Sequence, residues 1–148
     1  MLPVQDKGGY RKFHYKRSDG LYHIGHDLNC DAGDEVKLLD EGIVLYCGLA
    51  EGFGSNGAKG GVVIIQHAGY VSLYGHVHGT IRKGQIVKKD ETIGKVHEYL
   101  SGTNDWTHLH WVNRLGTGIP KTKWGYVEFK DLKYYVEPIK FNEMIKGM

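Results

Sequence analysis

The sequence predicts a mainly β protein, folded as a compact antiparallel β-sheet domain. Its 148 residues include 22 glycines, which separate short runs of β-branched and aromatic residues. Short strands at this spacing are typical of antiparallel sandwiches and barrels. Within residues 20–116 no segment shows a sustained 3.6-residue apolar period, so we expect no amphipathic helix there. A chain of this length fits one domain with a real core, and we expect a single domain over residues 1–148.

The predicted strands are short runs bounded by turn residues. In chain order they are residues 36–39, 42–46, 61–67, 70–74, 80–86, 91–96 and 108–113. The clearest is 61–67, whose continuous apolar run predicts a strand buried on both faces. Residues 70–74 alternate and follow Ala68-Gly69, a turn signal, so these two runs are expected to form a hairpin.

The only predicted helix is a short one at the end of the chain, over residues 139–148. Two loops contain glycine, at residues 51–61 and 101–107, and the second lies directly before a pair of histidines. Because loops beside a site often shape it, both loops are expected near any site that the histidines form.

Composition and charge exclude several classes of function. The formal net charge is +2 and no block of like charges forms a tail, so we expect no nucleic-acid partner. No stretch approaches the roughly 18 apolar residues of a membrane helix, and we expect no membrane partner. Residues 1–17 contain no apolar core of a signal peptide. Cys30 and Cys47 are too few for a disulfide framework, so two separate thiols are favoured over a bridge.

Three short clusters of histidine indicate chemistry. They are His23-Ile-Gly-His-Asp27, Tyr74-Gly-His-Val-His78 and His108-Leu-His110. Histidine and aspartate are the usual ligands of a catalytic zinc, which takes three protein ligands and keeps one position open. His23, Asp27 and one histidine of the last cluster would supply that number, and the other histidines could carry protons. The clusters therefore predict a metal-assisted hydrolase.

Strand geometry brings these histidines together in pairs. Side chains at positions i and i+2 of a strand point to the same face, about 6.5 Å apart along the strand. His108 and His110 would then stand side by side, at a spacing suited to two groups on either side of one water, and so would His76 and His78. Gly25 argues against a helix between His23 and Asp27. The HExxH helix motif of other zinc peptidases is absent.

The ordered set HxGxD, YGH and HLH resembles the lysostaphin or LytM-type zinc endopeptidases, which cut peptidoglycan. Residues 62–76, 83–96 and 136–138 resemble further segments of that family, so the resemblance covers roughly residues 8–142. It implies a LytM-type β-sheet domain with a catalytic groove. It also implies that His23, Asp27 and His110 bind one Zn²⁺ per chain. His76 and His108 would act on the water and the transition state, and which of them is the base stays open.

The implied activity is hydrolysis of peptide cross-links of bacterial peptidoglycan by a metal-activated water. We expect the enzyme to be a monomer that acts at the cell wall, in the periplasm or outside the cell. The cleaved bond is either the D-Ala–diaminopimelate link or a glycine-rich bridge. Without a leader, the chain fits a phage lysin as well as a processed or trimmed bacterial enzyme. The alternatives are a non-catalytic LytM-type module that activates another wall hydrolase, in which the ligands are typically lost, and a lipoyl-type binding module.

Two segments depart from the family pattern. Residues 116–135 are longer than the usual link and rich in aromatic residues; we favour an added strand or hairpin on the core over a groove wall that contacts substrate. Residues 99–107 lack the common Gly-Xaa-Thr-Gly run, which leaves specificity open. The remaining histidines are expected to be structural or on the surface: His14, His26, His67, His78 and His97.

Overall fold

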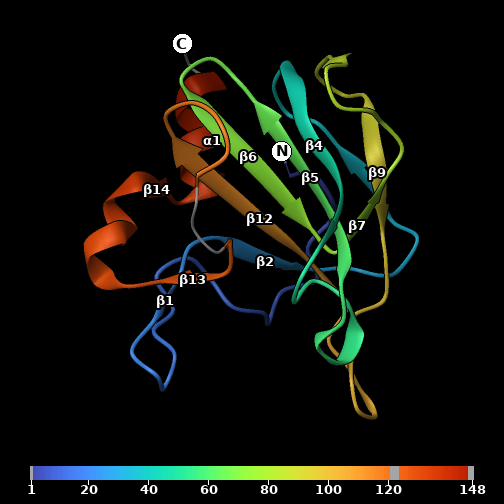
Figure 1. Cartoon of the computed structure of the whole chain (residues 1–148), viewed down its shortest axis with the longest axis vertical. Helices are drawn as coiled ribbons and strands as arrows, with labels where there is room; N and C mark the ends of the chain where they lie inside the picture. Colours follow the sequence, from blue (N-terminus) through green and yellow to red (C-terminus); the bar gives the residue numbers. More distant parts are fainter. Residues whose placement is uncertain (1, 121–123, 147–148) are drawn as a thin grey trace.

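A computed structural model describes residues 2–120 and 124–146, and it shows a main antiparallel sheet of seven strands (Figure 1). Six strands follow one another in the order β14–β12–β6–β5–β4–β8, and β2 also pairs with β12. Their bounds are β2 (His26–Asn29), β4 (Gly42–Ala50), β5 (Gly60–Gln66), β6 (Tyr70–Gly75), β8 (Ile86–Val87), β12 (His108–Leu115) and β14 (Tyr135–Val136). The predicted mainly β, antiparallel fold class is confirmed.

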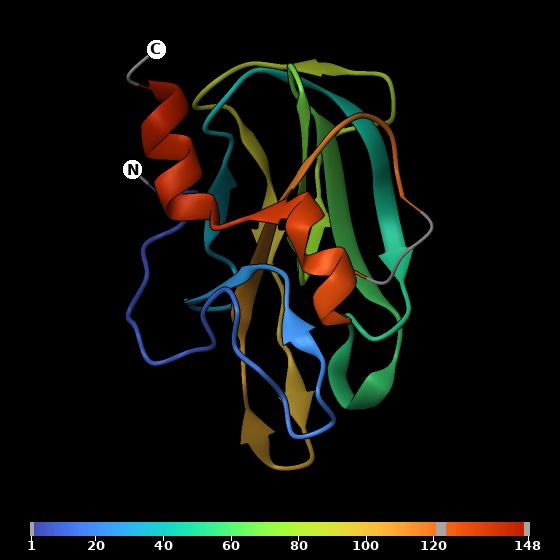
Figure 2. The same ribbon diagram turned by 90° about the vertical axis from the view of Figure 1, so that its left-hand side faces the viewer.

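A second sheet and two short ribbons complete the strands. The second sheet is β3 (Glu35–Lys37), β9 (Thr92–Val96) and β7 (Val77–Gly79), and the ribbons pair β1 (Tyr22–His23) with β13 (Tyr126–Val127) and β10 (Leu100–Ser101) with β11 (Asn104–Asp105). The helical segments are η1 (Ser55–Gly57), η2 (Phe129–Tyr134) and α1 (Pro138–Lys146). Figure 2 shows η2 and α1, in orange and red, following each other on one side of the strands.

Strand β5 is buried on both faces, as its apolar run predicts. Val63 and Ile65 belong to the larger core cluster, which also contains Val36 and Ile93 of the second sheet. Val62 and Ile64 point the other way, into a smaller cluster that includes Val127 and Leu132 from the C-terminal third. The main sheet therefore separates two apolar layers, and both of its faces are covered.

The predicted hairpin is present, because β5 pairs with β6 around a turn in which Gly69 has φ +83°. This positive φ is readily accessible only to glycine. Strands are also found where residues 36–39, 42–46, 91–96 and 108–113 predict them, although β4 continues to Ala50.

Two expectations about the strands were wrong or incomplete. Residues 80–86 do not form one strand, because Arg82 to Gln85 make a turn with Gly84 at φ +87°, and only Ile86–Val87 are extended beside β4. Strand β2 was not predicted at all. Its residues are largely polar, and its partner β12 lies about eighty positions away in the chain.

The C-terminal helix α1 spans Pro138–Lys146, close to the predicted 139–148, of which residues 147 and 148 lie outside the described residues. Its start follows from Glu137, whose carboxylate accepts hydrogen bonds from the backbone N–H groups of Ile139 and Lys140 at 3.2 and 2.7 Å. Pro138 is suited to the first helical position. None of the helices described here is long and apolar enough to cross a bilayer. Cys30 and Cys47 are separate thiols, as favoured.

Candidate metal centre

The pairing of β2 with β12 sets Asp27 directly opposite His110. Side chains alternate across a sheet, so the neighbouring pair, Leu28 and Leu109, points into the larger core from the other face. One register therefore fills the core on one side and places a carboxylate against an imidazole on the other. A slip by one residue would exchange these two faces.

His23 reaches the same point because Gly25 lets the chain cross β12 closely. A Cβ atom at Gly25 would lie 2.5 Å from the backbone oxygen of Trp111 and 2.8 Å from Cγ2 of Val112, so no larger residue fits without a shift. His23 itself lies on β1, which is held by β13 opposite Tyr126. The glycine of the HxGxD pattern thus lets two side chains from adjoining strands meet.

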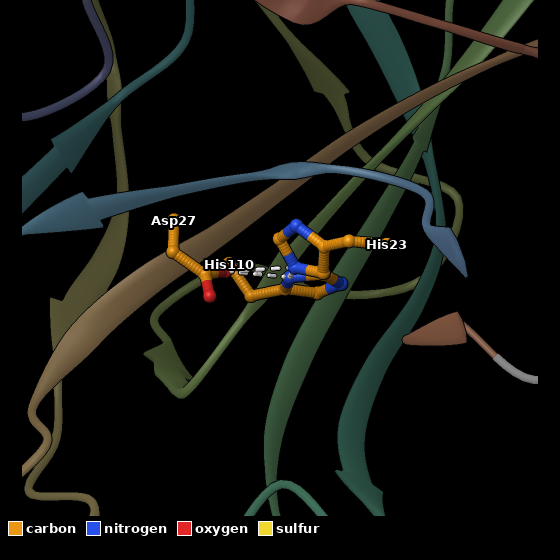
Figure 3. A group of neighbouring side chains, drawn as sticks. All are labelled: His23, Asp27 and His110. Carbon is orange, nitrogen blue, oxygen red and sulfur yellow. Dashed lines mark hydrogen bonds and ion pairs between the residues drawn. The ribbon is translucent and has the colours of Figure 1, made fainter. Parts of the chain in front are cut away.

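The three predicted ligands converge on one small volume, as Figure 3 shows. Nε2 of His23 lies 3.2 Å from Nδ1 of His110 and 3.2 Å from Oδ1 of Asp27, and Nδ1 of His110 lies 2.9 Å from the same oxygen. Ligands about 2.05 Å from a tetrahedral zinc are about 3.3 Å from one another. All three side chains are buried. The spacing therefore fits a small tetrahedral cation.

Hydrogen bonds to the backbone determine which nitrogen of each imidazole is free. Nδ1 of His23 donates to the carbonyl of Lys12 at 3.0 Å, and Nε2 of His110 donates to the carbonyl of Trp124 at 2.6 Å. A neutral imidazole has one N–H, so Nε2 of His23 and Nδ1 of His110 carry lone pairs toward each other. Two lone pairs and a carboxylate oxygen, with no proton between them, suit a metal ion. Histidines that bind a metal commonly donate their other ring N–H to a backbone carbonyl in this way.

His76 and His108 form a second pair beside these three residues. Their Nδ1 atoms donate to the carbonyls of Phe53 and Trp106 at 2.7 and 2.6 Å, which leaves both Nε2 atoms as acceptors. The ring centroids are 4.4 Å apart, and Nε2 of His108 lies 3.5 Å from Oδ1 of Asp27. Burial lowers the pKa of both imidazoles. The pKa of His76 is lowered further, because a protonated His108 would repel a second positive charge beside it. Both rings are therefore neutral at pH 7.

The backbone at His76 is unusual, because this residue has φ +66° between β6 and β7. Such a conformation costs of order 1–3 kcal/mol outside glycine and occurs most often at functional sites. The preceding Gly75 faces the ring of Phe53, where a Cβ atom would approach within 2.5 Å of Cε1. The YGH pattern therefore turns the His76 ring away from the strand path and under the Phe53 loop.

Several aromatic residues surround the five site residues, and one of them, Tyr126, lies in the segment 116–135 that the sequence offered as a possible groove wall. Tyr99 lies 4.2 Å from the ring of His76, Tyr126 lies 5.1 Å from that of His23, and Tyr10 lies 5.5 Å from that of His108. Phe53 lies in the glycine-containing loop 51–61, and Tyr99 lies just before the loop 101–107. Because both loops were expected near the site, this position could have indicated these two residues. Tyr10 has no such signal, because its neighbours in the sequence are polar and lack periodicity.

The other histidines lie outside this group. His26 points to the opposite face, where its Nδ1 lies 3.5 Å from Glu137, and His67 is buried against Tyr70 with its Nδ1 donating to Glu41. His14 and His78 are exposed. His97 is not simply on the surface: it is half-buried, and its Nε2 accepts the backbone N–H of Gly61 at 3.0 Å.

Within residues 116–135, of which 121–123 lie outside the described residues, the chain forms the strand β13 and the helical segment η2, and these pack on the core. That the segment is an addition to the family pattern stays a prediction. Val127 and Leu132 are buried in the smaller core cluster, and β13 pairs with β1. The same segment also supplies the Trp124 carbonyl that orients His110. It therefore supports the site through its backbone, a role that its aromatic composition does not reveal.

The fold is similar to that of several solved peptidases. Lysostaphin from Staphylococcus simulans matches with a TM-score of 0.65 at 18% identity over 95% of this chain, which spans 50% of the lysostaphin chain. LytU matches with a TM-score of 0.66 at 22% identity, over 89% of this chain and 81% of its own. A zinc-containing peptidase from Vibrio cholerae matches with a TM-score of 0.59 at 22% identity, over 80% of this chain and 40% of the Vibrio chain.

At these sequence identities, similarity to the solved structures establishes the fold alone. The family is established by a match of the sequence to a family model. The profile of peptidase family M23 matches residues 21–120, more than half of the chain. The matched range contains all five converging side chains: His23, Asp27, His76, His108 and His110. It does not contain residues 7–16 or 124–136, which hold the site from outside. The chain belongs to peptidase family M23.

Proposed function

We propose that this chain is a zinc-dependent endopeptidase that hydrolyses peptide cross-links of bacterial peptidoglycan. The observation that carries the proposal is the convergence of two imidazole lone pairs and one carboxylate oxygen within 3.2 Å of one another. The family membership and the lysostaphin-like fold support the same substrate class. We propose His23, Asp27 and His110 as the ligands of one zinc ion per chain.

The proposed metal would act as a Lewis acid that polarises a peptide carbonyl and lowers the pKa of water. The chain's own residues then have separate tasks. His76 and His108 are neutral, and each presents a free Nε2 that can accept a proton from water. Once protonated, either ring can stabilise the developing oxyanion or return the proton to the leaving amine. Tyr99, packed on His76, restricts how far this ring can swing.

A non-catalytic LytM-type activator is the second candidate function. Such a module does not need a complete set of ligands, whereas here the three proposed ligand atoms lie close together and two further imidazoles each have a free Nε2. The geometry therefore favours the enzyme. We further propose that the chain acts on the wall as a monomer, because its substrate is a bulky polymer.

The test is incubation of the zinc-loaded protein with purified peptidoglycan, followed by mass spectrometry of the released fragments. We expect new amino groups at one defined peptide bond, and none with His108→Ala. Walls with diaminopimelate and walls with glycine bridges are digested in parallel, so the cleaved bond is identified in the same experiment. Intact walls of both types, with zinc bound to the protein, would favour the activator instead.

A further inference from the structure

An open hollow of about 580 Å³ lies beside the candidate metal centre, in the part of the chain that precedes the family match. It is lined by residues 9–15, and its formally charged side chains are Arg11 and Lys12, with no acidic residue among them. The same segment adjoins the site directly. The backbone carbonyl of Arg11 accepts the N–H of Asp27 at 2.8 Å, and that of Lys12 orients His23.

Arg11 is held in place by aromatic rings. Its guanidinium carbon lies 4.7 Å from the ring centroid of Tyr15 and 5.8 Å from that of Tyr126, and its Nη1 donates a hydrogen bond to the hydroxyl of Tyr126. The Tyr126 ring packs in turn on His23, with 5.1 Å between the centroids. Only one aromatic ring therefore separates this charge from a proposed zinc ligand.

The charge of Arg11 is not compensated by an acid. Arg17 also lies over Tyr126, 4.0 Å from the ring centroid, but it bonds Asp19 through Nε at 3.0 Å and Nη2 at 2.5 Å. Within residues 2–120 and 124–146, Arg11 forms no ion pair, and its bonding partner is a neutral phenol. A guanidinium carries five N–H donors in a planar fork that matches a carboxylate, so Arg11 keeps most of them available for a ligand.

The other side of Tyr10 has the opposite charge. There, a smaller hollow of about 220 Å³ is lined by Tyr10 and by the acidic side chains of Asp31, Glu98 and Asp105. Asp31 is paired with Lys7 at 2.5 Å, so the negative charge of this hollow comes from Glu98 and Asp105. Tyr10 lines both hollows and contacts the ring of His108, one of the proposed catalytic residues. A negatively charged group on a bound peptide is repelled from the acidic hollow and attracted to Arg11. The charge distribution therefore favours one orientation of a bound peptide, with its negatively charged group toward Arg11.

We infer that Arg11 binds a free carboxylate of the peptide substrate, beside the bond to be cleaved. This inference rests on the proposed peptidase function and selects between its two substrates. In a diaminopimelate cross-link, the carbon that carries the linked amine also carries a carboxylate, whereas a glycine bridge is uncharged along its length. Arg11 therefore favours the diaminopimelate type, and Tyr15 and Tyr126 position the guanidinium for a two-point contact.

The test measures binding, so that it does not depend on cleavage. His108→Ala, which should retain zinc but not cleave, is loaded with zinc and titrated calorimetrically with a cross-linked diaminopimelate peptide and with the same peptide in which that carboxylate is an amide. The variants below are made in this same background. We expect the amide to bind roughly tenfold more weakly, the difference expected from a charge-assisted hydrogen bond. Arg11→Gln should weaken binding of the carboxylate form by a similar factor and remove the difference between the two peptides.

Matched variants distinguish a charge contact from a disturbed fold. Arg82→Gln removes an exposed arginine from the turn before β8 and should leave both affinities unchanged. Tyr126→Phe keeps the Arg11 charge but removes its hydrogen-bond partner, and should reduce the preference severalfold without abolishing it. If Arg11→Gln does not fold, the Tyr126→Phe result and the loss of preference at high salt decide the question.

Equal affinity for the two peptides when Arg11 is intact would overturn the inference, as would an Arg11→Gln variant that weakens the binding of both peptides equally. These outcomes are separate from failure of the proposed function. A protein that discriminates between the peptides but cleaves neither would retain the Arg11 site and disprove the peptidase. A protein that cleaves both equally well, without discrimination in binding, would retain the peptidase and disprove the Arg11 site.

Discussion

At the scale of single residues, the candidate centre depends on where four imidazole protons lie. Each ring donates one N–H to a backbone carbonyl, at Lys12, Phe53, Trp106 or Trp124, and so directs its other nitrogen inward. The two pairs differ in what that nitrogen faces. His23 and His110 face each other and a carboxylate at metal-ligand spacing, whereas the rings of His76 and His108 lie 4.4 Å apart beside these residues, with Nε2 of His108 3.5 Å from Oδ1 of Asp27. We therefore expect mutations in the two pairs to have different effects on zinc binding and on turnover.

His108→Ala should retain zinc and lose at least 100-fold in turnover, because general acid–base help is typically worth 10²–10⁴-fold. His110→Ala should lose both zinc and turnover, because it removes one of three ligand atoms. Elemental analysis of the purified variants, together with wall digestion, measures both quantities. A His108→Ala protein without metal would contradict the assigned roles.

A separate prediction concerns His67, which lies far from the site and is buried against Tyr70. Burial lowers the pKa of its imidazole. As the pH falls below about 6.5, the unfolded chain takes up the proton before the folded chain does, so the free energy of unfolding decreases. The contribution of His67 is therefore complete above about pH 7 and is lost progressively toward acid.

Urea unfolding at about pH 7.5 and about pH 5.5 tests this sign. His67→Asn keeps a donor for the carbonyl of Glu41 but cannot be protonated, so it should lose less stability on acidification. Part of the loss should remain, because burial also lowers the pKa of His26 and His97. An identical loss in the variant and the wild type would show that His67 contributes nothing to acid sensitivity.

The five side chains that converge were all singled out from the sequence, and their roles stay predictions, whereas their hydrogen-bond partners could not be predicted. His23, Asp27 and His110 stand in recognisable patterns, because metal ligands need particular side chains. The carbonyls that orient them belong to the backbone, which is chemically the same at every residue. Arg11 was also missed, since its surroundings depend on Tyr126, 115 positions further along the chain.

At the scale of secondary-structure elements, the close crossing of the β1–β2 connection over β12 positions two proposed ligands. Gly25 is the contact point, with its α-carbon against the backbone of Trp111. Strand β13 then fixes β1 from outside, through the pairing of His23 with Tyr126. The elements that support the site thus come from both ends of the chain.

Gly25→Ala should destabilise the protein by about 1–3 kcal/mol, as overpacking of a close contact does, and should weaken zinc binding by moving β2 away from β12. Gly125→Ala is the matched control, because a Cβ atom there has no neighbour within 4 Å. Urea midpoints and zinc content of both variants measure the effect. Wild-type stability and zinc content in Gly25→Ala would show that the crossing can relax.

Elements with strong local signals could be predicted, and elements defined by distant partners could not. The apolar run of β5 and the turn at Gly69 are local features, and both were predicted. Residues 80–86 were wrongly predicted as one strand because β-branched residues flank a turn whose Gly84 outweighs their preference. Strand β2 has a single apolar residue, Leu28, next to the proposed ligand Asp27, and so lacks the apolar alternation of an ordinary strand.

At the scale of the whole molecule, a bound metal would join segments that are far apart in the sequence. His23 and His110 are 87 positions apart, and β1, β2 and β12 each supply one proposed ligand. A ligand that binds only the folded state stabilises it by mass action, by about 2.7 kcal/mol at 100 times its dissociation constant. The metal should therefore increase the stability of the whole fold as well as serve the chemistry.

Removing the metal with a chelator should lower the melting temperature by roughly 5–11 °C for a domain of this size, if zinc is present at about 100 times its dissociation constant. Calorimetric scans with zinc and with chelator measure the shift. His110→Ala is the control and should melt at the same temperature in both solutions. A shift in the variant equal to that of the wild type would show that the metal binds elsewhere.

The backbone carbonyls that hold the four imidazoles have a consequence for how this protein can change over evolution. The side chains of Lys12 and Trp106 are exposed, and replacing either leaves its carbonyl in the chain, whereas those of Phe53 and Trp124 pack on the smaller core cluster. Laboratory selection for new cleavage specificity can therefore diversify positions 12 and 106 beside the site while the orientation of the His23 and His108 rings is inherited unchanged.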